Sequence, residues 1–159
     1  MLAARTGEPF TFTTLAARAK VSRRTLYTHW GSIERVISDA VTLRVGEAAA
    51  DFSSPDPRER LRNFLSSARS GIADPVTRVA VTALMNRSSY DAEAARSLAG
   101  MAAAHLQHFR TSVGEIDRDG YLQLVGPVLF AELIGGEAAS DALIDTLVER
   151  GMGLLGPGD

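Results

Sequence analysis

Apolar residues recur at spacings of three and four along almost the whole chain, which is the period of an α-helix. Alternating runs of β-branched or aromatic residues, which are typical of half-buried strands, do not occur in the sequence. The pattern therefore predicts an all-α fold, in which capping residues, glycines and prolines mark the helix ends.

A short helix is expected from Phe12 to Ala19, after "RTGEP" has closed a stub of helix at the start of the chain. Thr11 can cap this helix, because its side-chain oxygen can accept a bond from a free N–H group of the first turn. Leu15 and Ala16 then share an inner face with Phe12.

A second helix is expected to begin after Ser22, which can cap it, and to run to about Trp30. The letters "GS" then break the helix, and Ser32 can cap a longer one. The apolar stripe of this longer helix consists of Val36, Ile37, Ala40 and Val41. The indole of Trp30 is expected to pack against the same helix.

Five longer helices are expected in the remainder, the first of them opened by Pro57. Their expected bounds are 57–71, 76–89, 91–113, 121–134 and 141–155. In the helix over 121–134, the residues expected along one stripe are Leu122, Val125, Leu129 and Leu133. The helix over 141–155 is apolar on more than one narrow face, which predicts burial on two sides, one of which a second subunit could cover.

Charge is unevenly distributed along the chain, whose formal net charge is −2. Residues 1–50 carry seven Lys or Arg against four acidic residues, a balance of +3, and the remainder carries ten against fifteen, a balance of −5. This asymmetry predicts that only the N-terminal segment meets a polyanion.

Other features of composition indicate a soluble, cytoplasmic protein. The chain has no cysteine, which excludes disulfides and thiolate metal sites. Met1 is followed by no charged segment with an apolar core, so a signal peptide is not expected. The longest apolar stretch, "LVGPVLFAELIGG", is too short to span a membrane and contains Glu132.

The helix after Ser22 carries the residues that indicate a function. Two helices joined by a tight turn, the second with basic, hydroxyl and aromatic residues on its exposed face, follow the helix-turn-helix plan for binding double-stranded DNA. Val21 and Leu26 can anchor this second helix. The residues expected to meet base edges are Arg23, Arg24 and Thr25, and those expected to meet phosphates are Tyr27, Thr28 and His29. The competing interpretation is a solvated helix face.

The segment "FTTLAARAKVSRRTLYTHWGSIERVISDAV" resembles the DNA-binding part of the TetR/AcrR family of transcriptional regulators. The resemblance covers residues 2–45 and rests on the small-residue helix, the "VS" turn, "TLY" and the aromatic residue two positions after Thr28. The first helix is shorter than in the family, and Ile33 stands where many members carry Lys.

The resemblance implies a DNA-binding domain over residues 1–45 and a helical ligand-binding and dimerisation domain over residues 46–159. It further implies a homodimer that is joined through the last two helices and binds a palindromic operator. A small-molecule effector would occupy the C-terminal domain and change the separation of the two DNA-binding parts.

Candidate effector contacts gather on the helices over 76–113: they are Met85, Tyr90, Met101, His105 and Phe109. The competing interpretation is ordinary apolar core and, for His105, a hydrogen-bonded core residue. His105 and His108 lie at a spacing at which two side chains can approach one metal ion, but the sequence offers no further ligand, so no metal site is expected. We expect no cofactor and no catalytic residue, since the chain has no glycine-rich phosphate loop and no grouping typical of a nucleophile.

The function that these observations favour is a ligand-responsive DNA-binding regulator, more readily a repressor than an activator. An alternative is a helical small-molecule-binding or scaffolding protein of the same fold that has lost DNA binding. An enzyme built on a helical bundle has no sequence feature in its favour.

Overall fold

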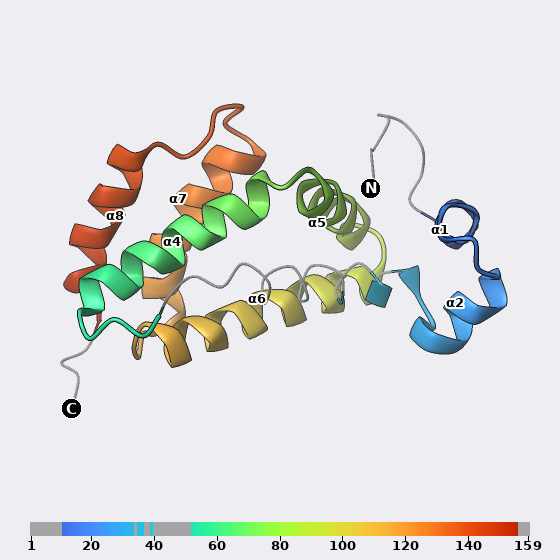
Figure 1. The fold of residues 1–159 in the computed structure, drawn as a ribbon, viewed down its shortest axis with the longest axis horizontal. Coiled ribbons are helices and arrows are strands. Elements are labelled where there is room, and N and C mark those ends of the chain that lie inside the picture. Colours follow the sequence, from blue (N-terminus) through green and yellow to red (C-terminus); the bar gives the residue numbers. More distant parts are fainter. Residues whose placement is uncertain (1–10, 34, 37–38, 40–51, 156–159) are drawn as a thin grey trace. The chain divides into compact units, whose positions relative to one another are not determined.

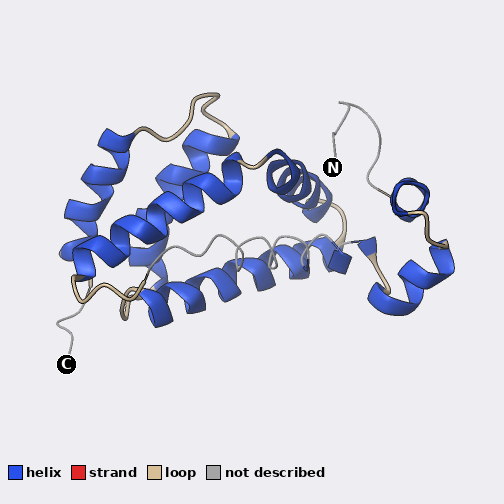
Figure 2. Ribbon diagram, in the orientation of Figure 1, coloured by secondary structure: helices blue, strands red, loops and turns tan. Residues whose placement is uncertain are grey.

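Figure 1 shows the computed structural model, which describes residues 11–33, 35–36, 39 and 52–155. Every regular element among these residues is a helix (Figure 2), so the all-α prediction is confirmed for the described part of the chain. The helices are α1 (Phe12–Ala19), α2 (Arg23–Trp30), α4 (Pro57–Ala73), α5 (Pro75–Ser88), α6 (Ala92–Ser112), α7 (Arg118–Leu133) and α8 (Asp141–Met152). None of these helices is both long enough and apolar enough to cross a bilayer.

The chain divides into two compact units, which are described separately. Unit 1 consists of Met1–Arg44 and Pro75–Met101, and unit 2 consists of Val45–Asp74 and Ala102–Asp159. Helix α6 contributes residues to both units. The division into a DNA-binding domain over residues 1–45 and a ligand-binding domain over residues 46–159 stays a prediction.

Capping residues fix the helix ends in unit 1 as the sequence predicts. The Thr11 hydroxyl accepts a bond from the Thr14 N–H at 3.3 Å, and the Thr14 hydroxyl accepts one from the Thr11 N–H at 3.1 Å. Ser22 caps α2 through the N–H group three residues further on. Helix α1 ends at Lys20 in the left-handed conformation (φ 55°), and α2 ends at Gly31 (φ 71°), where a glycine is unstrained.

A small apolar core holds α1 and α2 together. Its buried members are Phe12, Ala16, Leu26 and Ile33, and Leu15, Trp30 and Val36 pack against them. The Trp30 indole N–H donates to Asp39 Oδ2 at 3.0 Å, and residues 33, 35, 36 and 39 are helical, so Trp30 packs against the following helix as expected. The stub before Thr11, and the stripe residues Ile37, Ala40 and Val41, lie outside the described residues.

The core of unit 2 is formed mainly by α4, α7 and α8, with α6 contributing its C-terminal part. Helix α8 packs against both α4 and α7, which buries Ile144, Leu147 and Val148. These residues lie along one stripe of α8, so burial on a second side, which a second subunit could supply, stays a prediction.

The predicted stripe of α7 is wrong in part. Val125 is buried, but Leu122 is 47% exposed. Two apolar residues outside the predicted stripe are exposed as well, Phe130 by 60% and Ile134 by 65%. The side of α7 that faces the core consists of Gly120, Tyr121, Leu124, Val125, Val128 and Glu132. Since α7 is apolar on nearly every side, spacing alone did not identify its inner face.

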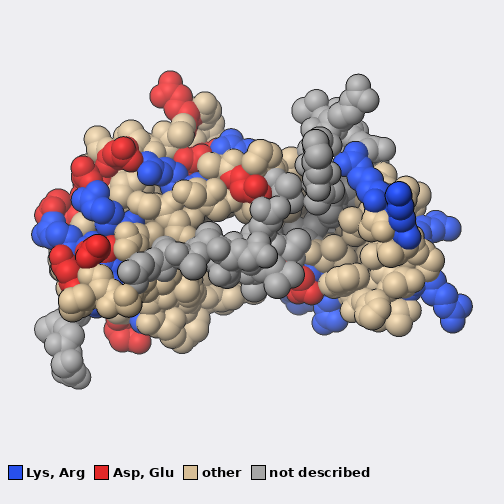
Figure 3. Space-filling model, viewed as in Figure 1, with Lys and Arg blue, Asp and Glu red and all other residues tan. Residues whose placement is uncertain are grey.

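Ion pairs join α4 to α8 along their polar sides, and Figure 3 shows basic and acidic side chains interleaved over this part of the surface. We call these pairs the α4–α8 ladder: Arg58 with Glu149, Arg62 with Asp145, and Arg69 with Asp141. The carboxylates are largely exposed, so each pair is worth no more than about 1 kcal/mol. The order of the pairs matches the antiparallel arrangement of the two helices.

The loop between α7 and α8 is held by the peptide groups of Ala139. Its N–H donates to Oε1 of the buried Glu132 at 2.9 Å, and its carbonyl accepts a bond from Arg69 at 3.0 Å. This satisfies the buried carboxylate, which would otherwise destabilise the core.

Candidate functional sites

The exposed side of α2 carries all six residues predicted to contact DNA. Leu26 points into the small core, whereas the six side chains around it are exposed. We call them the α2 surface: Arg23, Arg24, Thr25, Tyr27, Thr28 and His29. Because Ser22 caps the helix, the first three of them occupy its N-terminal turn.

Positive charge is concentrated at this surface. The segment 11–33 contains four basic residues and no acidic residue, and Figure 3 shows basic side chains projecting from the α1–α2 part. Within the described residues, the guanidinium groups of Arg23 and Arg24 have no hydrogen-bond or ion-pair partner. Two cations on a first turn oppose the helix dipole, which costs about 0.3–1 kcal/mol each, and a bound anion would offset that cost.

The hydroxyl groups of the α2 surface differ in availability. The ring of Tyr27 packs on Phe12, with centroids 4.3 Å apart, which holds the side chain in place. Its hydroxyl has no partner in the described part of the chain. The Thr28 hydroxyl, in contrast, donates to the Arg24 carbonyl at 2.8 Å, so a phosphate would have to displace that bond. The Thr25 hydroxyl lies 2.8 Å from the Ser22 hydroxyl.

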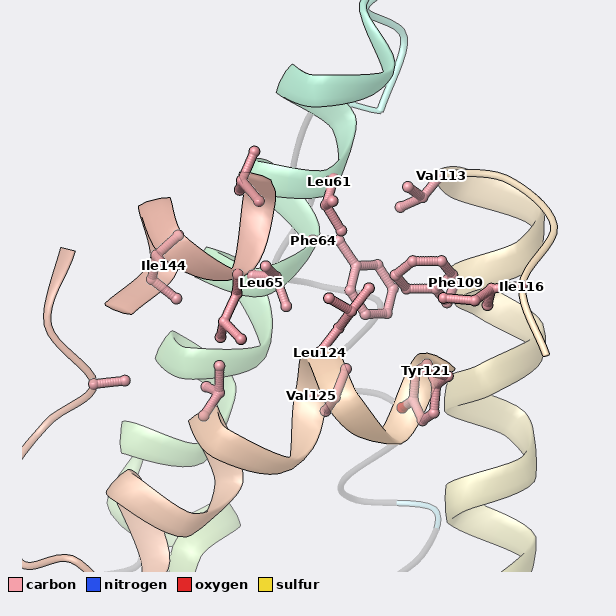
Figure 4. Packing of buried hydrophobic residues seen from close by; sticks show 14 residues of the cluster. Leu61, Phe64, Leu65, Phe109, Val113, Ile116, Tyr121, Leu124, Val125 and Ile144 are labelled. Carbon is pink, nitrogen blue, oxygen red and sulfur yellow. The ribbon is translucent and has the colours of Figure 1, made fainter. Parts of the chain in front are cut away.

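A second group of polar and aromatic side chains lies inside unit 2. We call it the aromatic cluster: Phe52, Phe64, His105, His108, Phe109 and Tyr121. Ring centroids lie 4.8 Å apart for Phe64 and Phe109, and 5.7 Å apart for Phe109 and Tyr121. Figure 4 shows these three rings meeting from α4, α6 and α7.

His105 and Tyr121 form a hydrogen-bonded pair within the cluster, with 2.5 Å between Nδ1 and the phenolic oxygen. Burial, and to a smaller extent the neighbouring His108, lower the pKa of His105 to about 4. Burial also raises the pKa of Tyr121 above its usual range. Both groups are therefore uncharged at pH 7.

The predicted effector contacts are divided between the two units. Met85, Tyr90 and Met101 belong to unit 1, where Tyr90 is 74% exposed. His105 and Phe109 belong to unit 2 and meet in the aromatic cluster. The sequence reasoning missed Phe64 and Tyr121 as their neighbours. The aromatic side chains of Phe64 on α4 and Tyr121 on α7 could have indicated a shared cluster. Helical spacing, however, does not reveal which helix faces contact each other.

The histidines of the cluster have protein partners. Nδ1 of His105 bonds to Tyr121, and Nδ1 of His108 lies 3.2 Å from the Ser112 hydroxyl. Over the described ranges, no group of three His, Cys, Asp or Glu side chains is placed to hold a metal ion.

No family profile, curated protein or solved structure matches the chain. The function is therefore argued from the α2 surface and the aromatic cluster themselves.

Proposed function

We propose that the protein is a DNA-binding transcriptional regulator of the TetR/AcrR type, in which α1 and α2 form a helix-turn-helix and α2 enters the major groove. It binds a palindromic operator as a homodimer, and a small-molecule effector releases it. The observation that carries the proposal is the first turn of α2, where Arg23 and Arg24 are exposed and their guanidinium groups have no partner among the described residues.

The chemistry of the α2 surface supports this role. A recognition helix contacts base edges with its N-terminal residues, and an Arg guanidinium can donate two bonds to O6 and N7 of guanine. Tyr27 lies one turn further along, with its ring held by Phe12 and its hydroxyl available to a phosphate oxygen. Ile33 is buried in the small core and supplies no charge to the DNA.

The exposed apolar side of α7 supports the homodimer. Leu122, Phe130 and Ile134 follow one another at spacings of eight and four, which places them on one side of the helix. Large apolar side chains grouped on a surface are typical of a contact with another protein. A second copy of the chain could cover them in the symmetric pairing that a palindromic operator requires.

The test is fluorescence anisotropy of the chain on the DNA that flanks its own gene, with random DNA as the reference and a salt titration of both. Binding should be sequence-dependent and should weaken steeply with salt, because each phosphate contact contributes about 0.9 to the log–log slope. Arg23→Ala and Arg24→Ala should each cost about 1–3 kcal/mol on the operator and less on random DNA. Tyr27→Phe should weaken both by similar factors.

Arg96→Ala is a matched control, because it removes the same charge from an exposed position on α6. Its affinity for the operator should stay within about twofold of the unchanged protein, which a surface charge outside the interface permits. If Arg23→Ala and Arg24→Ala lower the affinity for operator and for random DNA equally, the two arginines do not read bases. If the unchanged protein binds both DNAs weakly and neither variant changes its affinity, the proposal is refuted and a ligand-binding or scaffolding protein is favoured.

A further inference from the structure

One hydrogen atom lies between His105 Nδ1 and the hydroxyl of Tyr121, and the surroundings decide which residue supplies it. Tyr121 is 6% exposed, and its hydroxyl has no other acceptor in the described part of the chain. If His105 donated, the phenolic hydrogen would be left without a partner inside the core, which is costly. Tyr121 is therefore the donor, and the neutral imidazole carries its own hydrogen on Nε2.

The Nε2–H group of His105 is then a donor with a fixed direction. Among the residues that the structure describes, no acceptor bonds to it. His105 is only partly buried, whereas Tyr121 is 6% exposed, so the histidine is the member of the pair that a ligand can reach. A hydrogen bond from another residue to one imidazole nitrogen fixes the tautomer and the orientation of the ring. The other nitrogen is then positioned to bind a ligand.

Apolar rings surround this donor. The Phe64 centroid lies 5.0 Å from that of His105, and the same Phe64 ring lies 6.2 Å from Phe52, which is itself partly exposed. The two rings that contact His105, those of Phe64 and Tyr121, carry no charge, and His108 is the neighbouring titratable group. A carboxylate would lose its hydration among these rings, whereas a neutral acceptor would lose much less.

We propose that His105 Nε2–H is the polar contact of the effector, and that the effector is a neutral, largely aromatic molecule bearing a carbonyl or ring-nitrogen acceptor. The proposal deepens the ligand-responsive function proposed above and rests on it. Tyr121 is a positioning residue, since it acts on the effector only by setting the tautomer of His105.

The first test is ¹⁵N NMR of the histidine side chains in the full chain at pH 7. His105 should show the Nε2–H tautomer, and Tyr121→Phe should convert it to a mixture while His29, which is exposed in unit 1, stays unchanged. A predominant Nδ1–H tautomer in the unchanged protein would overturn the proposal.

The second test titrates three probes of similar shape: acetophenone, ethylbenzene and benzoate. Acetophenone should shift the Nε2–H resonance and bind about 2- to 10-fold more tightly than the other two, the factor that one net hydrogen bond supplies. His105→Phe, which keeps the ring, should abolish this preference, and His29→Phe should leave it intact. Equal binding of acetophenone and ethylbenzene, or no binding of either up to their solubility, would overturn the proposal.

DNA anisotropy in the presence of acetophenone separates this proposal from the regulator function. Release of the operator by acetophenone, lost in His105→Phe, supports both. If the chain binds no operator but retains the acetophenone preference, the effector site stands and the regulator function fails. If the chain binds operator but shows no preference among the probes, the effector site fails alone.

Discussion

Acid should destabilise unit 2 as the pH falls from 6.5 toward 4, and His105 is the reason. In the unfolded chain this histidine takes up a proton near its ordinary pKa of 6.5, whereas burial lowers the pKa in the folded chain to about 4. The unfolded state therefore binds more protons between these values. Stability is fully present above pH 6.5 and falls as the pH decreases toward 4, by about 3 kcal/mol in all and by about 2 kcal/mol between pH 7 and pH 5.

The assay is urea unfolding followed by circular dichroism at pH 7, 6 and 5. His105→Gln keeps a polar side chain but cannot titrate, so its loss of stability between pH 7 and pH 5 should shrink to under about 0.5 kcal/mol. His29→Gln is the control, because His29 is exposed, and it should retain the pH dependence of the unchanged protein. The fluorescence of Trp30, the only tryptophan, reports on unit 1 and gives an internal reference.

An equal pH dependence in the unchanged protein and in His105→Gln would refute this reasoning. It would mean that His105 protonates in the folded chain near its ordinary pKa, and hence that the aromatic cluster does not exclude water from the imidazole.

Three further substitutions test the packing, the proposed dimer and a cap. Gly151→Ala should lower the free energy of unfolding by about 1–3 kcal/mol, because a Cβ atom there would overlap the buried Leu61 side chain. Gly71→Ala, whose Cβ meets nothing within 4 Å, should raise the free energy of unfolding by about 0.5–1 kcal/mol. Denaturant unfolding would measure both, and a stabilising Gly151→Ala would contradict the packing of α8 on α4. Phe130→Glu should shift sedimentation toward the monomer with the helical content unchanged; an unaltered sedimentation coefficient would move the interface elsewhere. Ser22→Ala should destabilise unit 1 by about 1 kcal/mol in tryptophan-monitored unfolding, and no change would show that the cap bond is dispensable.

Helix ends were the most predictable part of the fold, because they depend on chemistry within a few residues. Thr11 and Ser22 cap α1 and α2 where the sequence places them, and Pro57 opens α4. Each capping side chain accepts a bond from an N–H group at most three positions away, so both partners can be read from a short stretch of sequence.

The inner side of α7 and the partners of His105 were not predictable in the same way. Leu122 and Leu124 are chemically identical, yet the first is exposed and the second fully buried, because the positions of α4 and α8 decide which side is covered. Tyr121 meets His105 only because α7 returns against α6 after a loop. Such contacts depend on helix packing, which the spacing of apolar residues within one helix does not contain.

The α4–α8 ladder has a consequence for the order of events during synthesis. Arg58 pairs with a residue 91 positions later in the chain, and Arg69 with one 72 positions later. When α4 leaves the ribosome, the helices that cover its apolar side have not yet been made, so the core of unit 2 can close only after α8 has emerged. Until then, the apolar side of α4 has no partner helix, and exposed apolar surface of this kind favours association between unfinished chains.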